Sequence, residues 1–312
     1  MGRRPFIIDC DTGTDDAIAI AAALYCDQVE VKAVTSVNGN VAHKYTSKNN
    51  LDLLEYLGFD DIPVAKGADS PIMDNPYHSD GTHGNTGLGN IKLPDAAHKQ
   101  FDKRLASELI YQTAVEEKGE LELLVIGPMT NIAICLMEHP DLKDLVKHIW
   151  FMGGSVIGGN VTTTAEFNIW IDPMAAHIVT QSGIPQTMVG LDVTTAAAMK
   201  EHHAEELRAC GTKAALLCAD LLDYMFERRD RGGEDAIMHD AMAFAAAVCP
   251  ECLECRDFYV DVECFGQYTK GHTMVDRRGR LGKAPNVSVA LKVDEEKFCS
   301  WLVNAIKKSA DR

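Results

Sequence analysis

Short apolar segments typical of β-strands alternate along this chain with longer segments in which apolar residues recur at helical spacing. The first such pair is Pro5–Cys10 followed by Asp15–Cys26, and the rhythm continues to the end of the sequence. Further strands are predicted at Val29–Val37, Leu121–Ile126, His148–Met152, Gln186–Leu191, Phe258–Phe265 and Val287–Val293. Further helices are predicted at Val41–Leu57, Thr130–Met137, Pro173–Ser182, Lys200–Arg228 and Glu295–Lys308.

Alternating strands and helices are typical of α/β folds, in which helices cover both faces of a mostly parallel sheet. We therefore predict one Rossmann-like α/β domain spanning residues 1–312, an open and mostly parallel sheet with a few antiparallel strands from residues 258–293. The chain contains no internal repeat and no low-complexity linker. The polar, glycine-containing segments Asp69–Leu93 and Arg228–Glu234 are predicted to be long loops, which often act as lids in such folds.

Composition and charge exclude several classes of partner. The chain carries 30 Lys and Arg against 46 Asp and Glu, a net charge of −16 that would repel nucleic-acid phosphates and anionic lipid. Apolar runs such as Ala17–Tyr25 are shorter than the ~20 residues of a membrane span. We expect neither nucleic acid nor a membrane as partner. With no apolar signal segment before Asp9 and scattered cysteines, a cytoplasmic location with reduced thiols is predicted.

Three closely spaced cysteines, Cys249, Cys252 and Cys255, form a CxxCxxC pattern, with Cys264 further on. Such spacing can bind zinc or an iron–sulfur cluster. The alternative, which we favour, is that the segment forms the last turn of the apolar helix that precedes it.

Acidic residues crowd the point where the first predicted strand passes into the first helix. Asp9, Asp11, Asp15 and Asp16 lie where ligands bind in open α/β sheets, beyond the carboxyl end of a strand. These carboxylates would repel one another unless a cation or shared protons relieved them. Ligation by oxygen alone favours Ca²⁺ or Mg²⁺, and the less regular shell of Ca²⁺ suits ligands drawn from distant loops.

A simpler interpretation covers part of this acidic segment. Asp15 and Asp16 would favour the positive end of the helix that begins there, and Thr12 or Thr14 would cap it. This interpretation does not explain Asp9 and Asp11 at the end of the strand, because carboxylates there destabilise the fold unless something binds them.

The same segment allows a different enzyme. The run Asp9-Cys10-Asp11-Thr12-Gly13-Thr14 is similar to the nucleophile loop of Mg²⁺-dependent phosphatases of the haloacid dehalogenase type. The phosphatase pattern has Thr or Val where Gly13 stands, and the later acidic motif of those enzymes has no clear counterpart here. Because the similarity is partial, a phosphatase is kept as the first alternative and not as the main hypothesis.

The run from Asp9 to Asp16 also resembles the DxDxGxDD signature of the nucleoside hydrolases, the inosine–uridine-preferring type especially. Further blocks similar to that family follow in the same order: Gly39-Asn40, His83-Gly84, Gly127-Pro128-Met129-Thr130-Asn131, Met152-Gly153-Gly154, Gly159-Asn160, Ala165-Glu166-Phe167-Asn168-Ile169, Asp172-Pro173 and His239-Asp240. The blocks run from residue 5 to about 245, and residues 286–301 resemble the last strand and helix of the family. Any one block is a weak signal, but the ordered set is specific.

The resemblance implies hydrolysis of the N-glycosidic bond of ribonucleosides to free base and ribose. It implies a Ca²⁺ ion held by Asp11, Asp16, Asp240 and the backbone carbonyl of Ile126, together with a water and the ribose 2′- and 3′-hydroxyls. Asp11 would act as the general base toward that water, and His239 would protonate or stabilise the departing base.

The resemblance also assigns residues to the substrate pocket, namely Asp15, Asn40, His83, Met152, Asn160, Glu166 and Asn168. Asp9 is expected behind the cation ligands, where it would orient them. Related enzymes often carry a tyrosine over the base where this chain has the charged, glycine-rich segment Arg228–Glu234. Tyr224 and Phe226 either replace that tyrosine or pack in the core, so the base preference stays open.

A non-catalytic nucleoside- or ribose-binding protein is the second alternative. Every position assigned to cation binding and water activation holds a competent residue, which favours an enzyme acting on a small-molecule ribonucleoside. A homodimer or homotetramer is expected from the family alone.

Overall fold

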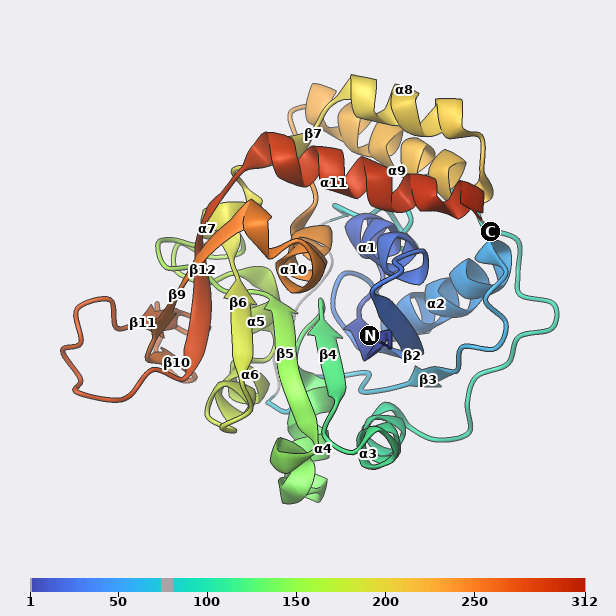
Figure 1. The fold of residues 1–312 in the computed structure, drawn as a ribbon. Coiled ribbons are helices and arrows are strands. Elements are labelled where there is room, and N and C mark those ends of the chain that lie inside the picture. The colour runs from blue at the N-terminus through green and yellow to red at the C-terminus, as the bar shows by residue number, and fades with distance from the viewer. Residues whose placement is uncertain (1, 74–80, 312) are drawn as a thin grey trace.

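Eight strands form one sheet through the middle of the molecule, with helices packed on both faces (Figure 1). The computed structural model describes residues 2–73 and 81–311, so residues 74–80 of the predicted loop Asp69–Leu93 lie outside the described residues. In the order of the sheet, the strands are β3 (Val64–Lys66), β2 (Val29–Ser36), β1 (Arg4–Cys10), β4 (Leu121–Val125), β5 (Val146–Met152), β6 (Gln186–Val189), β12 (Val287–Val293) and β9 (Leu253–Phe258). All neighbours pair in parallel except β12 and β9, which confirms the predicted α/β fold.

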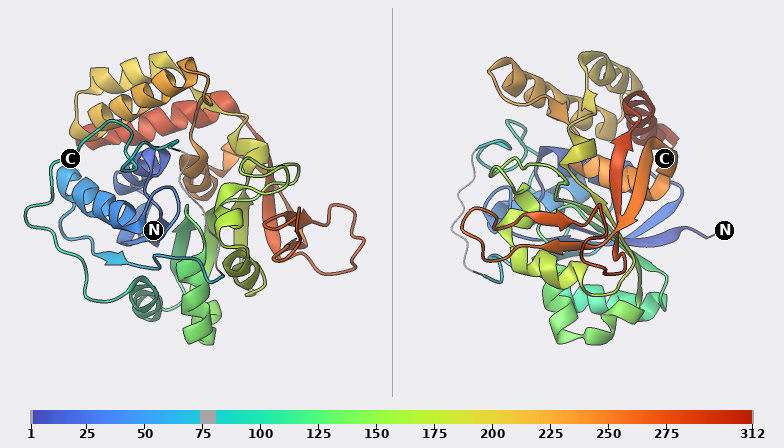
Figure 2. Two further views of the ribbon diagram at one scale, coloured as in Figure 1. Left: turned by 180° about the vertical axis from the view of Figure 1, so that it is seen from behind. Right: turned by 90° about the vertical axis from the view of Figure 1, so that its left-hand side faces the viewer.

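The helices form two layers, one on each face of the sheet (Figures 1 and 2). One layer contains α1 (Thr14–Leu24), α2 (His43–Leu57), α8 (Glu201–Cys210), α9 (Lys213–Asp230), α10 (His239–Val248) and α11 (Glu295–Lys307). The other contains α3 (Ala106–Glu117), α4 (Thr130–Glu138) and α6 (Pro173–Thr180). The short elements are α5 (Phe167–Ile171), α7 (Leu191–Thr194) and the antiparallel pairs of β7 (Ala198–Met199) with β8 (Ala236–Ile237) and of β10 (Val260–Val262) with β11 (Thr273–Val275).

The central strand β1 contributes to both hydrophobic cores. Phe6, Ile8 and Cys10 pack in the core with α1 and α10, whereas Ile7 packs on the other face with α3 and α4. A strand covered on both faces is apolar at successive positions, which explains the unbroken apolar run before Asp9. The acidic turn that follows β1 is thereby anchored to a strand that is buried on both faces.

Two element boundaries differ from the prediction. The predicted helix Lys200–Arg228 is two helices, because Gly211 adopts a left-handed conformation (φ 74°) that ends α8, and Thr212 then caps α9. Helix α9 continues to Asp230, into the predicted loop. The predicted strand Phe258–Phe265 is also wrong in extent, since β9 ends at Phe258 and the separate strand β10 ends at Val262.

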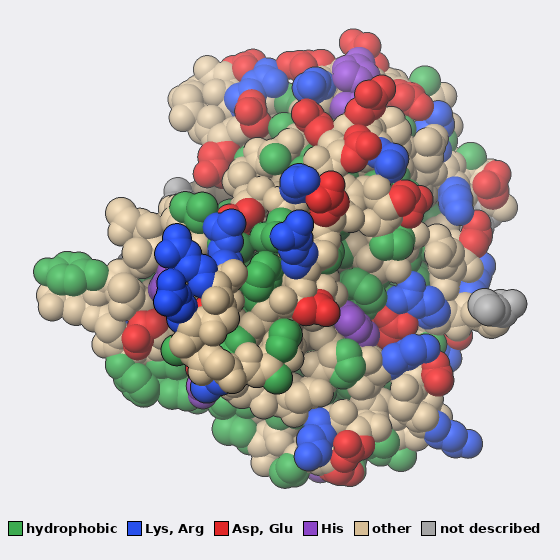
Figure 3. Space-filling view, turned by 60° about the vertical axis from the view of Figure 1, so that its left-hand side comes forward, with side chains coloured by type: hydrophobic (Ala, Val, Ile, Leu, Met, Phe, Trp, Pro, Cys, Tyr) green, Lys and Arg blue, Asp and Glu red, His purple; other side chains and the backbone are tan. Residues whose placement is uncertain are grey.

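Helices α8 and α9 lie side by side at one end of the molecule, next to α11, in every view (Figures 1 and 2). Acidic and basic side chains are mixed over the face seen in Figure 3, this end included. Within residues 2–73 and 81–311, no helix combines the length and the apolar character that crossing a membrane requires.

Candidate active site

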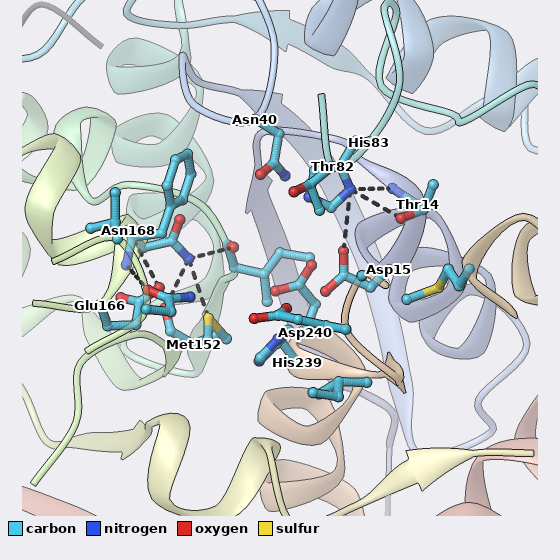
Figure 4. Close-up of a pocket in the computed structure, with 18 of the residues that line it drawn as sticks. Thr14, Asp15, Asn40, Thr82, His83, Met152, Glu166, Asn168, His239 and Asp240 are labelled. Atoms are coloured by element: carbon cyan, nitrogen blue, oxygen red, sulfur yellow. Dashed lines mark hydrogen bonds and ion pairs between the residues drawn. The ribbon is translucent and has the colours of Figure 1, made fainter. Parts of the chain in front are cut away.

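A cavity of about 480 Å³ opens at the carboxyl ends of the central parallel strands (Figure 4). Its wall contains every predicted site residue except Asp11 and Asp16, namely Asp15, Asn40, His83, Ile126, Met152, Asn160, Glu166, Asn168, His239 and Asp240. Asp11 and Asp16 are almost completely buried, with 1% and 0% of their surface exposed. The structure thus brings residues from widely separated parts of the chain to one place.

Three carboxylates meet at one side of this cavity. Asp15, Asp16 and Asp240 each place an oxygen within 4.8 Å of the other two, and all three are buried. Asp15 and Asp16 stand in the first turn of α1 and Asp240 in the first turn of α10, where the positive ends of the helix dipoles favour negative charge. The carboxylates of Asp16 and Asp240 are thus close enough that a shared proton or a cation would relieve their repulsion.

Burial and mutual repulsion both disfavour the charged forms of these acids. Burial, together with the charge of Asp15, raises the pKa of Asp16 to about 7. Burial likewise holds the pKa values of Asp11 and Asp240 well above the usual range, with added repulsion from Asp16 and from Asp15. Among the described residues, no Lys or Arg forms an ion pair with these acids, so the cluster suits an added cation.

Asp11 sits in a slot between the loops that follow β2 and β4. Its Oδ2 accepts a hydrogen bond from the backbone N–H of Asn40 (2.7 Å). A Cβ atom on Gly39 would lie only 2.0 Å from this Oδ2, and one on Gly127 only 2.8 Å from Oδ1. Both loops therefore need glycine to approach the carboxylate so closely.

Two carboxylate oxygens of the site are buried without any hydrogen-bond partner among the described residues, Asp11 Oδ1 and Asp16 Oδ1. Buried polar atoms are normally paired, so unpaired ones call for a missing partner. The neighbouring atoms that could coordinate a metal ion are also carboxylate oxygens. This group of oxygen ligands fits a hard divalent cation such as Ca²⁺ or Mg²⁺. The fit concerns the chemistry of the donors and does not identify the ion.

A second layer of side chains holds the acidic turn from behind. The Asn40 side chain donates to Asp16 Oδ2 (3.1 Å). Asp9 lies beneath, where its Oδ1 accepts hydrogen bonds from Asn131 Nδ2 (2.7 Å) and Thr35 Oγ1 (2.5 Å). These contacts orient the turn and agree with the supporting position expected for Asp9.

The wall near α5 is built around Glu166 (Figure 4). Its carboxylate caps α5 by accepting hydrogen bonds from the backbone N–H groups of Asn168 (2.9 Å) and Ile169 (3.2 Å), and it also accepts one from the Gly154 N–H (2.9 Å) after β5. Burial nevertheless raises the pKa of Glu166 to about 7. The carboxylate is therefore fixed beside the cavity by backbone groups rather than by a basic side chain.

Asn168 and Asn160 complete this wall. The Asn168 side chain donates to the backbone carbonyls of Ile126 (3.0 Å) and Met152 (3.2 Å). Asn160 Oδ1 accepts from the backbone N–H of Phe167 (3.0 Å). The Ile126 carbonyl thus has a donor in this structure, and cation ligation by it stays a prediction.

Both predicted histidines line the cavity (Figure 4). His83 Nδ1 accepts a hydrogen bond from the Thr14 backbone N–H (3.1 Å) and lies 3.8 Å from Asp15 Oδ1. His239 Nδ1 is 2.8 Å from Thr194 Oγ1, and burial lowers the pKa of the ring below its usual value. Each ring is thus oriented through a contact at its Nδ1 atom.

Sequence reasoning missed the part of the wall that comes from α9 and the segment after it. The missed residues are Met225, Arg228, Gly233, Glu234 and Ile237, with Thr14, Thr82, Val161 and Phe167 elsewhere. The aromatic candidates Tyr224 and Phe226 do not line the cavity. The Tyr224 hydroxyl instead donates to the Thr82 carbonyl (3.4 Å) next to His83. Met225 and Arg228 are three residues apart, a spacing that places two side chains on the same face of a helix, and this was the signal in the sequence that could have found them.

The cysteine segment lies away from this site. Cys249 and Cys252 are buried with their Sγ atoms 2.9 Å apart, in the turn that follows α10, whereas Cys255 is exposed on β9. Within residues 2–73 and 81–311, the grouping of metal-binding side chains that emerges is Asp15, Asp16 and Asp240, without a cysteine.

Residues 6–300 match the family described as inosine-uridine preferring nucleoside hydrolase. The chain belongs to this family. It is therefore an N-ribosyl hydrolase, and the phosphatase and binding-protein alternatives lose their support. This nucleoside hydrolase is 40% identical over 306 residues to the pyrimidine-specific ribonucleoside hydrolase RihA of Escherichia coli, across 97% of this chain and 98% of RihA.

Solved structures agree with the family. A purine-preferring ribonucleoside hydrolase from Gardnerella vaginalis superposes with a TM-score of 0.91 at 31% identity, covering 98% of this chain and 99% of that protein. The plant nucleoside hydrolase PpNRh1 superposes with a TM-score of 0.90 at 30% identity, over 97% and 99% of the two chains. A pyrimidine-specific relative and a purine-preferring one thus each align with nearly the whole chain, so the fold alone does not decide which base is cleaved.

Proposed function

We propose that this nucleoside hydrolase releases free base and ribose from ribonucleosides with Asp11 as general base and Ca²⁺ as cofactor. The observation that carries the proposal is the meeting of buried carboxylates from α1 and α10 on one wall of the cavity. The residues that would hold the ion are Asp11, Asp16, Asp240 and the Ile126 carbonyl, with Asp15 close enough to join them. Bound there, a divalent cation would make a water more acidic and bind the ribose diol.

Asp11 is suited to accept the proton of the attacking water. Its Oδ2 is fixed by Asn40, so the unpaired Oδ1 has one orientation in which it can act. A positioned general base contributes typically about 10²- to 10⁴-fold to a rate. The raised pKa of Asp11 applies to the protein without a cation, and a nearby positive charge favours the ionised form that a base requires.

The polar wall would hold the ribose still while the bond breaks. Asp15 and Asn168 are proposed to hydrogen-bond the ribose hydroxyls, and Glu166 and Asn160 to hold the 5′ side, because these side chains border the cavity and are themselves fixed. Hydrogen-bond partners that are themselves fixed would orient the ribose toward the attacking water, which lowers the entropic part of the activation barrier.

Departure of the base needs a partner at the other end of the bond. When the C1′–N bond breaks, its electron pair leaves with the base nitrogen, and a proton or a hydrogen bond stabilises the resulting anion. His239 is proposed for this role because Thr194 orients its ring at the cavity wall. His83, Asn40 and Met152 complete the pocket.

We further propose a cytoplasmic location and a homodimer or homotetramer. All ten cysteines are free, which agrees with a reducing compartment. The oligomeric state follows from the family alone.

The test is incubation of the purified protein with inosine, uridine, adenosine and cytidine, with and without a chelator, followed by detection of free base and reducing sugar. We expect release that stops on chelation and returns with Ca²⁺. Release of base that the chelator leaves unchanged would contradict the proposed cation.

A further inference from the structure

Two consecutive asparagines are buried on helix α2, next to the acidic turn. Asn49 is 7% exposed and Asn50 is completely buried. Asparagine is a poor helix former, and a buried amide is costly unless it is hydrogen-bonded. Asn50 meets this requirement within the core, where its side chain bonds with the side chains of Cys10 and Thr12. Asn49 differs, because it connects two separate loops of the site.

The amide nitrogen of Asn49 bridges two backbone carbonyls. Nδ2 donates to the carbonyl of Thr12 (3.1 Å), inside the acidic turn, and to the carbonyl of Thr86 (2.8 Å), in the loop of residues 81–91. Both hydrogens of a primary amide can be used in this way. A Cβ atom on Gly87 would lie only 2.6 Å from this Nδ2 and 2.8 Å from the Thr12 carbonyl oxygen. The loop therefore needs glycine there to approach the asparagine and the acidic turn so closely.

Thr86 belongs to a closed turn that also contains His83. The backbone N–H of Gly89 donates to the His83 carbonyl (3.0 Å), so residues 83–89 form a compact unit. His83 lines the cavity and accepts a hydrogen bond from the backbone N–H of Thr14 in the acidic turn (Figure 4). Because the unit is closed on itself, movement of Thr86 would also displace His83.

We propose that Asn49 is a positioning residue, which holds the loop of His83 at a fixed distance from the acidic turn. This inference rests on the proposed function, in which His83 is part of the nucleoside pocket. Asn49 is not one of the described residues that line the cavity, and its hydrogen bonds go to backbone carbonyls. It would therefore act on the reaction only through the loop. In an active site, a displacement of about 1 Å can lower a rate by up to about 10²-fold.

The experiment is a double-mutant cycle between Asn49 and His83. In the presence of Ca²⁺, Asn49→Ala should lower kcat/KM for uridine and inosine by about 10- to 100-fold. His83→Ala should cause a loss of at least that size, and the double variant should lose no more than His83→Ala alone. The reason is that a residue acting only through His83 has nothing left to position once that side chain is removed.

Asn286 offers a matched control for the loss of the bridge. Its Nδ2 also donates to two backbone carbonyls, those of Thr180 (2.9 Å) and Val260 (2.9 Å), and it lies outside the cavity wall. Asn286→Ala should lower the free energy of unfolding by at least as much as Asn49→Ala, since its Oδ1 also accepts from the Val260 N–H. We expect it to leave kcat/KM within about twofold of wild type.

A second variant reaches the same junction from the loop. Gly87→Ala leaves Asn49 in place but puts a methyl group against its Nδ2 and against the Thr12 carbonyl. It should reproduce the loss in kcat/KM, and this loss should also disappear in the His83→Ala background. The loop lies outside the two hydrophobic cores apart from Leu88, so the core of the protein should still fold.

A spectroscopic measurement tests the anchor without turnover. In protein with isotope-labelled histidine and bound Ca²⁺, the ring resonance of His83 is assigned by its absence in His83→Gln. This resonance should shift or broaden in Asn49→Ala and in Gly87→Ala, and it should stay unchanged in Asn286→Ala. A ring that leaves its fixed place changes both its surroundings and its motion.

Two outcomes would overturn the inference. One is a His83 resonance that Asn49→Ala leaves unchanged. The other is a double variant whose loss equals the product of the two single losses, which would show a general structural role for Asn49. A wild-type protein that cleaves no riboside in Ca²⁺ would overturn the proposed function itself, whereas the His83 resonance would still decide whether Asn49 holds the loop.

Discussion

The two ends of the central sheet bury carboxylates in opposite ways. At the amino end, Glu122 of β4 is 2% exposed and accepts hydrogen bonds from Arg4 Nε (2.8 Å) and Trp150 Nε1 (2.7 Å). At the carboxyl end of the sheet, Asp11, Asp16 and Asp240 are buried without a basic partner among the described residues, and burial raises their pKa values.

The contrast shows how burial alone misleads about function. A buried acid with a basic partner completes the fold, and removing either member destabilises the protein. A group of buried acids without one disfavours the fold until a ligand arrives. The partner, rather than the depth, distinguishes the structural carboxylate from the functional ones.

Replacing Asp11 with Asn should give the largest effect and sharpen this comparison. We expect kcat for ribonucleosides to fall about 10³- to 10⁴-fold, because the general base is lost. The free energy of unfolding of the cation-free protein should stay equal or rise, since one buried charge is removed. Urea denaturation measures the free energy of unfolding, and steady-state release of base measures kcat.

Asp235→Asn, at an exposed acid outside the cavity wall, is the control for Asp11→Asn and should change neither quantity. A loss of stability above about 2 kcal/mol in Asp11→Asn would contradict the distinction.

Replacing Glu122 with Gln should do the reverse. We expect the free energy of unfolding to fall by about 2 kcal/mol, below the ~3–5 kcal/mol of a fully buried pair because Arg4 is partly exposed, with kcat unchanged. Glu120→Gln is the matched control, since its pair with Lys147 lies on the surface and should contribute less than about 0.5 kcal/mol. Equal losses from Glu122→Gln and Glu120→Gln in urea denaturation would remove the structural role of Glu122.

His239→Ala tests how the leaving base is stabilised at the acidic end. We expect kcat/KM to fall at least about tenfold for inosine and uridine, and much less for an activated aryl riboside that needs no proton. His202→Ala, on the exposed face of α8, should be silent. Equal losses on both kinds of substrate would exclude the proposed role of His239.

The smallest effect concerns pH at the amino end. Burial lowers the pKa of His148 to about 4, whereas the unfolded chain binds this proton near pH 6.5. Between these values the unfolded state holds more protons, so stability should fall as the pH falls from about 6.5 to 4. His148→Gln should reduce that fall by about 1 kcal/mol, discounted because the ring is only partly buried. Denaturation at pH 7 and pH 4.5 measures it, with the exposed His98→Gln as control. A fall unchanged by His148→Gln would assign it to other groups.

Much of the fold was predictable because strands covered on both faces are apolar at successive positions. The acidic turn was predictable because its aspartates are neighbours in sequence. Asp240 is distant in sequence and entered only through the resemblance, yet a carboxylate oxygen of Asp240 lies within 4.8 Å of one of Asp16 in the structure. The strand β3 was missed because its three residues are too few to show a periodicity. Helix α3 was missed because its apolar face is narrow.

The wall from α9 could not be predicted for a different reason. The predicted helix ended at Arg228 and the next residues were expected to form a loop, so no orientation was assigned to the arginine. Whether Met225 and Arg228 face the cavity depends on how α9 packs against α1 and α2, which is a tertiary property. Tyr224 illustrates this, because it supports the segment carrying Thr82 and His83 instead of contacting the base.

The slot formed by Gly39 and Gly127 has a wider consequence. Because two backbones, rather than packed side chains, clamp the Asp11 carboxylate, its position follows the spacing between neighbouring strands, which hydrogen bonding fixes near 4.8 Å. Hydrophobic residues below the sheet can therefore be exchanged during evolution while the reacting oxygen stays where it is. A single added methyl group at either glycine cannot be absorbed in the same way.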